Sequence, residues 1–158
     1  MGSGSFVPGS RFDAMNDPIT ILMKDHAEAK EILTKLGDSE PGDERRDMVK
    51  KVTAALELHM EIEETLVYPL VEKVEGAEVR EEADNEHGLA REGIAAMNKM
   101  VDEPGFGAAA ESLLGGILHH VGEEESEVLP ALKGKLDADE WSRLGDQVAA
   151  AHAAGDQE

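Results

Sequence analysis

The chain has 158 residues, 41% of them hydrophobic, which suffices for one domain with a substantial buried core. Its 35 acidic residues outnumber 15 Lys and Arg, and the net charge of −20 argues against nucleic acid or an anionic membrane as a partner. Because cysteine is absent, disulfides and thiolate-bound metals are excluded, and any metal must be held by nitrogen and oxygen ligands.

The first segment, residues 1–16, is rich in Gly and Ser. It lacks the positively flanked apolar run of a signal peptide and the long apolar stretch of a membrane span. We therefore expect a flexible leader, and a protein located in the cytoplasm.

Helix start and stop signals follow the leader. Asp17 and Pro18 have the order of an N-cap and a first helical residue, and Gly37 supplies a stop, so a helix is predicted over residues 18–36. A second helix should begin after residues 41–43 and end near Gly76, with Pro69 bending its last turns.

A third helix is predicted over residues 78–101, and the Gly- and Pro-containing segment 104–107 separates it from a fourth that ends at residue 133. Asp137 and Glu140 have the spacing of an N-terminal capping motif, which predicts a short fifth helix to about residue 153. Most of its apolar residues are Ala, so we expect it to lie against the other helices rather than complete their core.

Apolar positions in the four long helices recur in steps of three and four, as one buried stripe per helix requires. The predicted stripes are Ile19, Leu22, His26, Ala29, Leu33 and Leu36; Val49, Val52, Leu56, His59, Glu63, Leu66 and Leu70; Ala83, His87, Ala90, Ile94, Met97 and Val101; and Ala110, Leu113, Ile117, His120, Glu124 and Val128. The fold class predicted is an all-α, up-down-up-down antiparallel four-helix bundle over residues 17–136, followed by a short C-terminal helix and tail over residues 137–158.

The motif His-x-x-x-Glu-Glu occurs twice within these stripes. One copy begins at His59 and the other at His120, and each is preceded 33 residues earlier by another His that follows an acid, His26 and His87. The whole pattern repeats with a period of 61 residues. A His and a carboxylate at i and i+4 share one face of a helix, so a helix can present a nitrogen and an oxygen to the same ion.

Loop positions bring the four His to one level of the predicted bundle. His26 and His59 are symmetric about residues 42–43, and His87 and His120 about residues 103–104, both inside hairpin loops. A carboxylate buried beside them is costly without a cation. We predict six metal ligands, enough for two ions: His26, His59, Glu63, His87, His120 and Glu124.

Other metal motifs are absent or fit less well. The chain has no Glu-x-x-His, as ferritin-like bundles have, and no His-Glu-x-x-His, as zinc proteases have. A single structural zinc needs about four ligands and would leave two of the six unused. Two ions bridged by Glu63 and Glu124, with the four His as terminal ligands, use them all.

The order of these residues resembles the hemerythrin-like family of HHE cation-binding proteins, over about residues 17–133. The resemblance implies a non-haem di-iron centre with an oxo or hydroxo bridge, with iron preferred to Mn or Zn, that binds O2 or related small molecules. Oxygen-carrying hemerythrins add a fifth His four residues after that of the third helix, where this chain has Arg91, and commonly place the last carboxylate where it has Glu125. The missing nitrogen implies an open position on one iron, which points away from simple O2 carriage.

Residues beside the predicted ligands receive lesser roles. Asp25 and Glu86 each precede a ligand His, and we expect each to orient that His or to face water. Glu64 and Glu125 each follow a ligand Glu, and are expected to lie behind it or at the surface; whether either joins the ligands is left open.

Further residues are interpreted without a metal role. Tyr68 and Trp141 are predicted to be packing residues, His119 to face solvent or a helix interface, and His152 to belong to the tail. The run 123–127 is interpreted as mostly a solvated acidic face.

These predictions lead to a non-haem di-iron protein that binds or reacts with O2, hydrogen peroxide or nitric oxide, with Ala29 and Ala90 leaving room for such a ligand. Catalase-like disproportionation of peroxide is the enzymatic hypothesis, because a bridged metal pair can share a two-electron change. A non-catalytic sensor of O2, NO or iron, an iron-binding protein, and a purely structural bundle are the alternatives. The oligomeric state is left open.

Overall fold

The computed structural model describes residues 16–156; most of the predicted leader and the last two residues lie outside this range. Within it the chain is helical and contains no strand. The elements in order are α2 (Pro18–Gly37), α3 (Asp43–Ile62), the π-helical turn η2 (Glu63–Val67), α4 (Tyr68–Glu75), α5 (Ala77–Lys99), α6 (Phe106–Glu123), the π-helical turn η3 (Glu124–Val128), α7 (Leu129–Lys135) and α8 (Ala138–Asp156).

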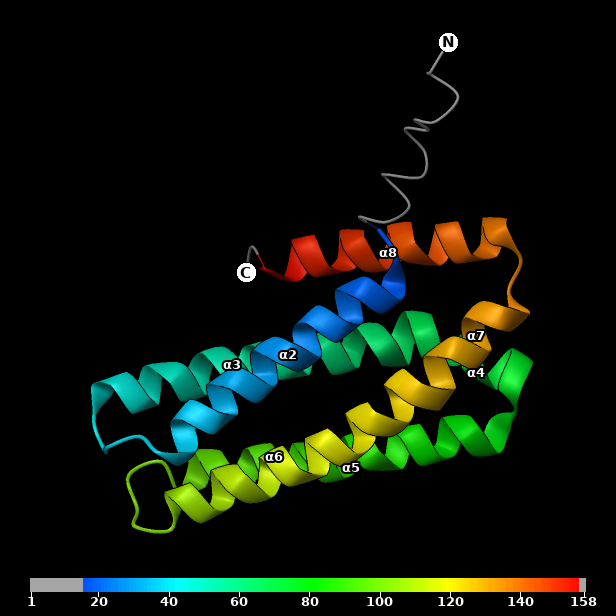
Figure 1. Cartoon of the computed structure of the whole chain (residues 1–158). Coiled ribbons are helices and arrows are strands. Elements are labelled where there is room, and N and C mark those ends of the chain that lie inside the picture. The colour runs from blue at the N-terminus through cyan, green and yellow to red at the C-terminus, as the bar shows by residue number, and fades with distance from the viewer. Residues whose placement is uncertain (1–15, 157–158) are drawn as a thin grey trace.

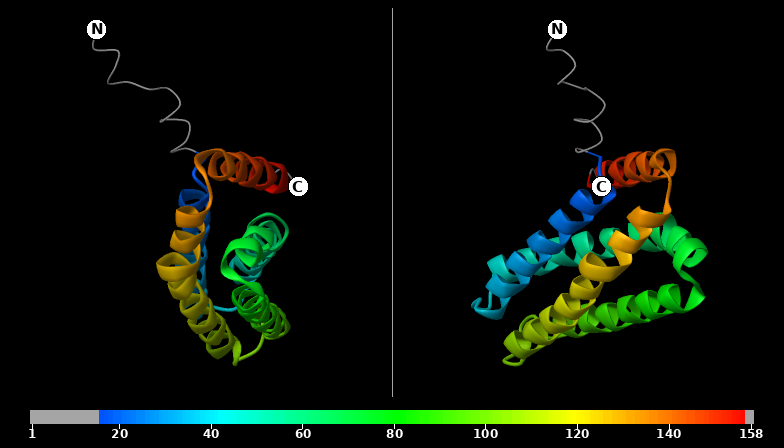
Figure 2. Two further views of the ribbon diagram at one scale, coloured as in Figure 1. Left: turned by 90° about the vertical axis from the view of Figure 1, so that its right-hand side faces the viewer. Right: turned by 45° about the vertical axis from the view of Figure 1, so that its right-hand side comes forward.

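Four long helical segments run antiparallel and form a closed bundle, which confirms the predicted fold class (Figure 1). α2 contacts both α3 and α6, and α5 contacts α6 and the α3–α4 segment. α8 lies along one side of the bundle, over α2 and α3, and contacts both (Figure 2). It is 19 residues long, ends three residues beyond the predicted end, and lies against the bundle as expected. It also adds to the core, contrary to the prediction, because Leu144 and Val148 are buried in it.

The ends of several elements follow from local chemistry. Asp137 and Glu140 form a reciprocal capping box: Glu140 N–H donates to Asp137 Oδ1 at 2.8 Å, and Asp137 N–H donates to Glu140 Oε1 at 3.0 Å. Only Gly76 separates α4 from α5, and its φ of 110° lies in the left-handed region that glycine adopts without strain. This single-residue turn starts α5 directly beside α4.

Five of the six positions predicted for the first helix are buried in α2, namely Leu22, His26, Ala29, Leu33 and Leu36. The sixth, Ile19, is half-buried, and Pro18 beside it is buried instead. Steps of three and four residues keep these side chains on one face of a 3.6-residue turn. The same rule holds in α3, α5 and α6 as far as the two π-helical turns.

Downstream of η2 the buried stripe lies one residue later than predicted. The sequence predicts Leu66 and Leu70 as core positions, whereas Val67 and Val71 are the fully buried residues. The cause is the π-helical turn, whose hydrogen bonds span five residues instead of four and so add one residue to a turn. The helix that follows is rotated by about 100° relative to an uninterrupted α-helix.

The second π-helical turn repeats this shift. Leu129 is buried where the sequence predicts Val128. A proline, Pro69 or Pro130, is the second residue of the α-helix that follows each turn. Because proline has no N–H, the α-helical ladder cannot continue through it, and the change of hydrogen-bond register occurs just before it.

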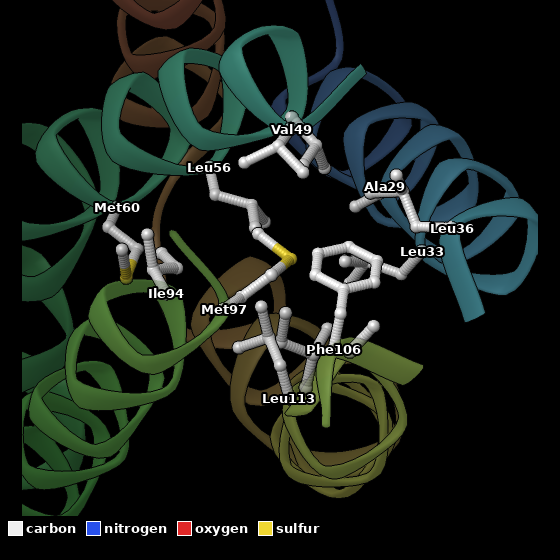
Figure 3. Close-up of a cluster of buried hydrophobic side chains, with 13 residues drawn as sticks. Ala29, Leu33, Leu36, Val49, Leu56, Met60, Ile94, Met97, Phe106 and Leu113 are labelled. Carbon is white, nitrogen blue, oxygen red and sulfur yellow. The ribbon is translucent and has the colours of Figure 1, made fainter. Parts of the chain in front are cut away.

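The core is divided into two clusters along the bundle. One lies toward the two hairpin loops and includes Leu33, Leu56, Met97 and Phe106 (Figure 3). The other lies toward α8 and includes Leu22, Val71, Leu129, Leu144 and Val148. On α2, α5 and the α6–α7 segment the polar residues of the predicted site lie between the two clusters in sequence. On the α3–α4 segment His59 and Glu63 lie on either side of the point where the first cluster ends and the second begins.

Within the described part of the chain, no helix combines the length and the apolar character that a membrane crossing requires.

Candidate metal centre

Six side chains from four long helical segments meet between the two core clusters. They are the six predicted metal ligands: His26 of α2, His59 of α3, Glu63 of η2, His87 of α5, His120 of α6 and Glu124 of η3. Glu63 and Glu124 are 0% and 1% exposed, so both carboxylates are withdrawn from water. The equal spacing from the hairpin loops, read from the sequence, therefore places the imidazoles at a common level.

The Nε2 atom of each His faces a carboxylate. His59 Nε2 and His87 Nε2 lie 3.3 and 3.0 Å from Glu63 Oε1. His26 Nε2 lies 3.3 Å from Glu124 Oε1, and His120 Nε2 lies 3.1 Å from Glu124 Oε2. Each carboxylate thus stands between an imidazole of its own helix and one from another helix.

The six residues form two overlapping sets that could each hold a cation. One set takes the His of α2 and α3, the other the His of α5 and α6, and both share Glu63 and Glu124; within each set the ligand atoms lie within 4.8 Å of one another. Glu63 Oε2 and Glu124 Oε1 are buried without a hydrogen-bond partner. His26 and His59 direct their Nε2 atoms at each other at 3.1 Å. Unsatisfied buried oxygens and facing nitrogens are costly alone and favourable around cations, so the donor set fits a metal pair.

A second layer of carboxylates holds the outer nitrogen of every imidazole. The Nδ1 atoms lie 2.6 to 2.9 Å from carboxylate oxygens in the pairs His26–Glu125, His59–Asp25, His87–Glu64 and His120–Glu86. With the proton on Nδ1 donated to the carboxylate, the Nε2 lone pair is left facing the centre. The outer carboxylates thus fix both the orientation of each ring and its tautomer.

This layer corrects the roles predicted for the flanking acids. Asp25 and Glu86 do orient imidazoles, but each acts on the His of the following helix and not on its own neighbour in sequence. Consecutive helical residues point about 100° apart, so an acid beside a ligand His faces the adjacent helix. Glu64 and Glu125 are likewise bound to imidazoles of other helices, and neither belongs to the two cation-binding sets.

Tyr68 lies inside the cluster, and the prediction that it only packs was wrong. Its hydroxyl donates to Glu124 Oε2 at 2.8 Å and lies 3.3 Å from Glu63 Oε1. The same oxygen is 3.1 Å from His87 Nε2 and 3.3 Å from His120 Nε2. The π-helical turn before Tyr68 rotates it onto the buried face, a rotation that α-helical periodicity could not foresee.

Two further residues reach the cluster through the outer carboxylates. Arg91 donates to Glu64 Oε2 at 2.7 Å and to Oε1 at 3.2 Å, and so supports the carboxylate that holds His87. His152 of α8 lies with Nε2 2.7 Å from Asp25 Oδ1. His152 was predicted to belong to a tail; it instead connects α8 to the carboxylate that orients a cluster imidazole.

The buried carboxylates of the cluster favour positive charge on the groups beside them. Burial would lower the pKa of His59, but Glu63 and Asp25 outweigh burial and hold it well above its ordinary value. For His120 burial is likewise outweighed, and Glu124 and Glu63 raise its pKa to about 9. Burial would raise the pKa of the Glu63 carboxyl, yet His59 and its other partners hold it well below its usual range. The Glu63 carboxylate therefore remains ionised and needs a cation or a protonated imidazole beside it.

A family model described as the hemerythrin HHE cation binding domain matches residues 17–132, a span that contains all six residues of the cluster. The chain belongs to the hemerythrin HHE cation-binding domain family. A crystal structure of a hemerythrin HHE cation binding domain-containing protein from Mycobacterium kansasii is similar at a TM-score of 0.77 and 22% identity, over 88% of this chain and 86% of that one. At this identity the similarity shows a common fold. A search of curated proteins finds no significant match.

Beside the cluster this HHE domain contains a largely apolar cavity of about 80 Å³. Ala29 and Ala90 both line it, which agrees with the space that these small residues were expected to leave. A water molecule needs roughly 10–15 Å³ of such space, so a diatomic molecule or a peroxide fits. The exposed residues Ala55 and Gly116 also contribute to the wall, so the cavity extends toward the surface.

An acidic groove of about 290 Å³ adjoins the cluster between α5 and the α6–α7 segment. Its lining includes His120 of the cluster and six Glu residues, namely Glu75, Glu82, Glu86, Glu123, Glu124 and Glu127. The acidic face predicted for residues 123–127 is only partly solvated, because Glu124 is buried in the cluster and Glu125 holds an imidazole.

Two other residues without a predicted metal role lie outside the cluster. The side chain of His119 is 70% exposed, as expected. Trp141 donates to Asp17 Oδ1 at 3.1 Å.

Proposed function

We propose that this HHE domain binds two metal ions, iron in preference to Mn or Zn, with His26, His59, Glu63, His87, His120 and Glu124 as ligands. The observation that carries the proposal is that two four-residue sets share both buried carboxylates, the arrangement that two bridged cations need. Imidazole and carboxylate donors suit all three metals, and the family resemblance favours iron.

We further propose that the loaded protein binds or reacts with O2, hydrogen peroxide or nitric oxide. A bound pair of iron ions would supply the two-electron chemistry that converts two molecules of peroxide into two of water and one of O2. The chain's own residues would hold the imidazoles through the outer carboxylates, and the apolar wall of the cavity would keep bulk water from the reacting ligand.

A second candidate function is a non-catalytic sensor of O2, NO or iron, or an iron-binding protein. The observation that favours it is the path from His59 through Asp25 to His152, which joins the cluster to a helix outside the four-helix bundle. A change at His59 would alter how α8 packs on α2 and α3. A partner protein that binds α8 could respond to that change.

The small molecules proposed to bind at the metal site are mostly uncharged. We also propose that the protein is cytoplasmic and has no nucleic-acid or membrane partner. A net charge of −20 repels polyanions and anionic lipid surfaces.

Metal analysis followed by peroxide addition tests the proposal. Protein produced without metal supplementation should contain two iron ions per chain, and peroxide should evolve O2 continuously. His59→Ala should lose metal and turnover while keeping its helical circular dichroism, whereas His119→Ala, a matched change at an exposed His, should keep both.

Three outcomes separate the candidates. O2 evolution that depends on iron supports the enzyme. Bound iron whose visible spectrum changes with azide, NO or peroxide, without turnover, supports the sensor. Protein that binds no metal under iron-replete conditions would refute both and favour a structural bundle.

A further inference from the structure

We propose that the hydroxyl oxygen of Tyr68 is a seventh metal ligand, on the ion held by His87 and His120. The inference rests on the proposed metal binding and adds a residue to that site. It makes the two halves of the cluster chemically different, although the other ligands repeat along the chain.

The position of the hydroxyl carries the argument. Tyr68 Oη lies 2.8 Å from Glu124 Oε2, 3.1 Å from His87 Nε2, and 3.3 Å from both His120 Nε2 and Glu63 Oε1. These four residues are all members of one of the two cation-binding sets. An oxygen in contact with every residue of a set stands where an ion must enter, so it has to leave or to bind that ion.

The packing of Tyr68 prevents it from leaving. The residue is 0% exposed and belongs to the core cluster nearest α8. Its ring lies against the His87 imidazole, with the ring centroids 5.1 Å apart and the planes inclined by 30°. Removing the side chain would empty a large part of a close-packed core, which strongly destabilises a fold. The hydroxyl therefore stays within reach of the ion.

Among the residues that the structure describes, none offers such a group to the other half of the cluster. The residue that corresponds to Tyr68 in the 61-residue repeat is Leu129, which has no donor atom. The half that contains Tyr68 is also the half of α5, where Arg91 stands in place of a further His and turns its guanidinium outward to Glu64. A His at position 91 would offer this ion a nitrogen, and Arg91 does not. Tyr68 offers the same ion an oxygen.

Coordination as phenolate breaks the O–H bond of Tyr68. The proton leaves to solvent, the oxygen electron pair forms the bond to the metal, and no electron changes hands. The hydrogen bond to Glu124 is lost at the same time, which frees that carboxylate to contact the ions.

The visible and resonance Raman spectra of ferric protein test the inference. Tyr68 is the single tyrosine of the chain, so an iron–phenolate charge-transfer band and its enhanced ring vibrations can arise from this residue alone. Wild-type protein should show both, and ring-deuterated tyrosine should shift the vibrations. Tyr68→Phe should lose the band and weaken the binding of one ion, whereas Trp141→Phe should retain the band.

The result for wild-type protein is decisive even if the Phe variant folds poorly. Two bound ferric ions without a phenolate band would overturn the role of Tyr68 and leave the proposed metal site standing. Failure to bind iron at all would overturn the proposed function, and with it this inference.

Discussion

The cavity beside the cluster gives the sharpest test of where a small ligand would bind. Ala29 is 6% exposed and lines the cavity from α2, one turn after His26. Long side chains on a helix lean toward its N-terminus, so a leucine here would extend toward His26. Ala29→Leu should therefore fill the space next to the proposed metal ions without removing a proposed metal ligand.

The expected effect on stability follows from the size of the cavity. Leucine adds three carbons to alanine, and each buried methylene contributes about 0.8 kcal/mol, so full accommodation would stabilise the protein by up to about 2.4 kcal/mol. Overpacking costs roughly 1–3 kcal/mol where no space exists, but here about 80 Å³ is open. We expect a net gain of about 1–2 kcal/mol, which for a chain of this size raises the melting temperature by roughly 2–8 °C.

Azide or peroxide titration of the iron-loaded protein, followed in the visible spectrum, measures the functional effect. Ala29→Leu should retain two irons and lose the ligand-induced spectral change. Ala27→Leu, an exposed change on the same helix, should behave as wild type. If Ala29→Leu is stable, fully loaded and still binds azide with wild-type affinity, the cavity is not the ligand site.

Three further predictions concern the cluster and its supports. Without metal, the raised pKa values of His59 and His120, the latter about 9, contribute stability that is present at pH 6 and lost as pH rises through 9. Because metal binding needs neutral imidazoles, the difference in melting temperature between iron-loaded and chelated protein should grow from pH 6 to pH 9, and a difference independent of pH would contradict this. Asp25→Asn should weaken metal binding by about 10–100-fold in chelator competition, since it loosens His59, and an unchanged affinity would show that His59 is held otherwise. Gly145→Ala should lower the melting temperature by disturbing the contact of α8 with the backbone just before α2, at a cost of roughly 1–3 kcal/mol, whereas Gly134→Ala, whose methyl meets nothing within 4 Å, should not.

Helix number, order and approximate ends could be predicted because they depend on local signals. The capping box of Asp137 and Glu140 and the stop at Gly37 act within a few residues. The buried stripe of α2 follows from periodicity alone. The convergence of six polar side chains was also predictable, because equal distances from hairpin loops determine height in an antiparallel bundle.

Contacts downstream of the π-helical turns could not be predicted in this way. An α-helical period carried past Glu63 places Leu66 inward and Tyr68 away from the centre, and one inserted residue reverses both assignments. Two prolines at the same position of the repeat were the available signal, but they do not by themselves indicate the direction of the rotation. The partner of Asp25 and the place of His152 depend on how neighbouring helices pack, which no local pattern contains.

The groove and the cavity that adjoin the cluster differ in the molecules they admit. Six carboxylates line the groove, and no Lys or Arg is among the described residues of its wall, so it attracts cations and repels anions. The cavity is walled mainly by apolar side chains and suits small uncharged molecules. The proposed metal ions can therefore enter the cluster through the groove, and the proposed small ligands through the cavity. A side chain that closes the cavity should leave the rate of iron uptake unchanged, while added salt should slow that uptake without affecting the entry of O2 or peroxide.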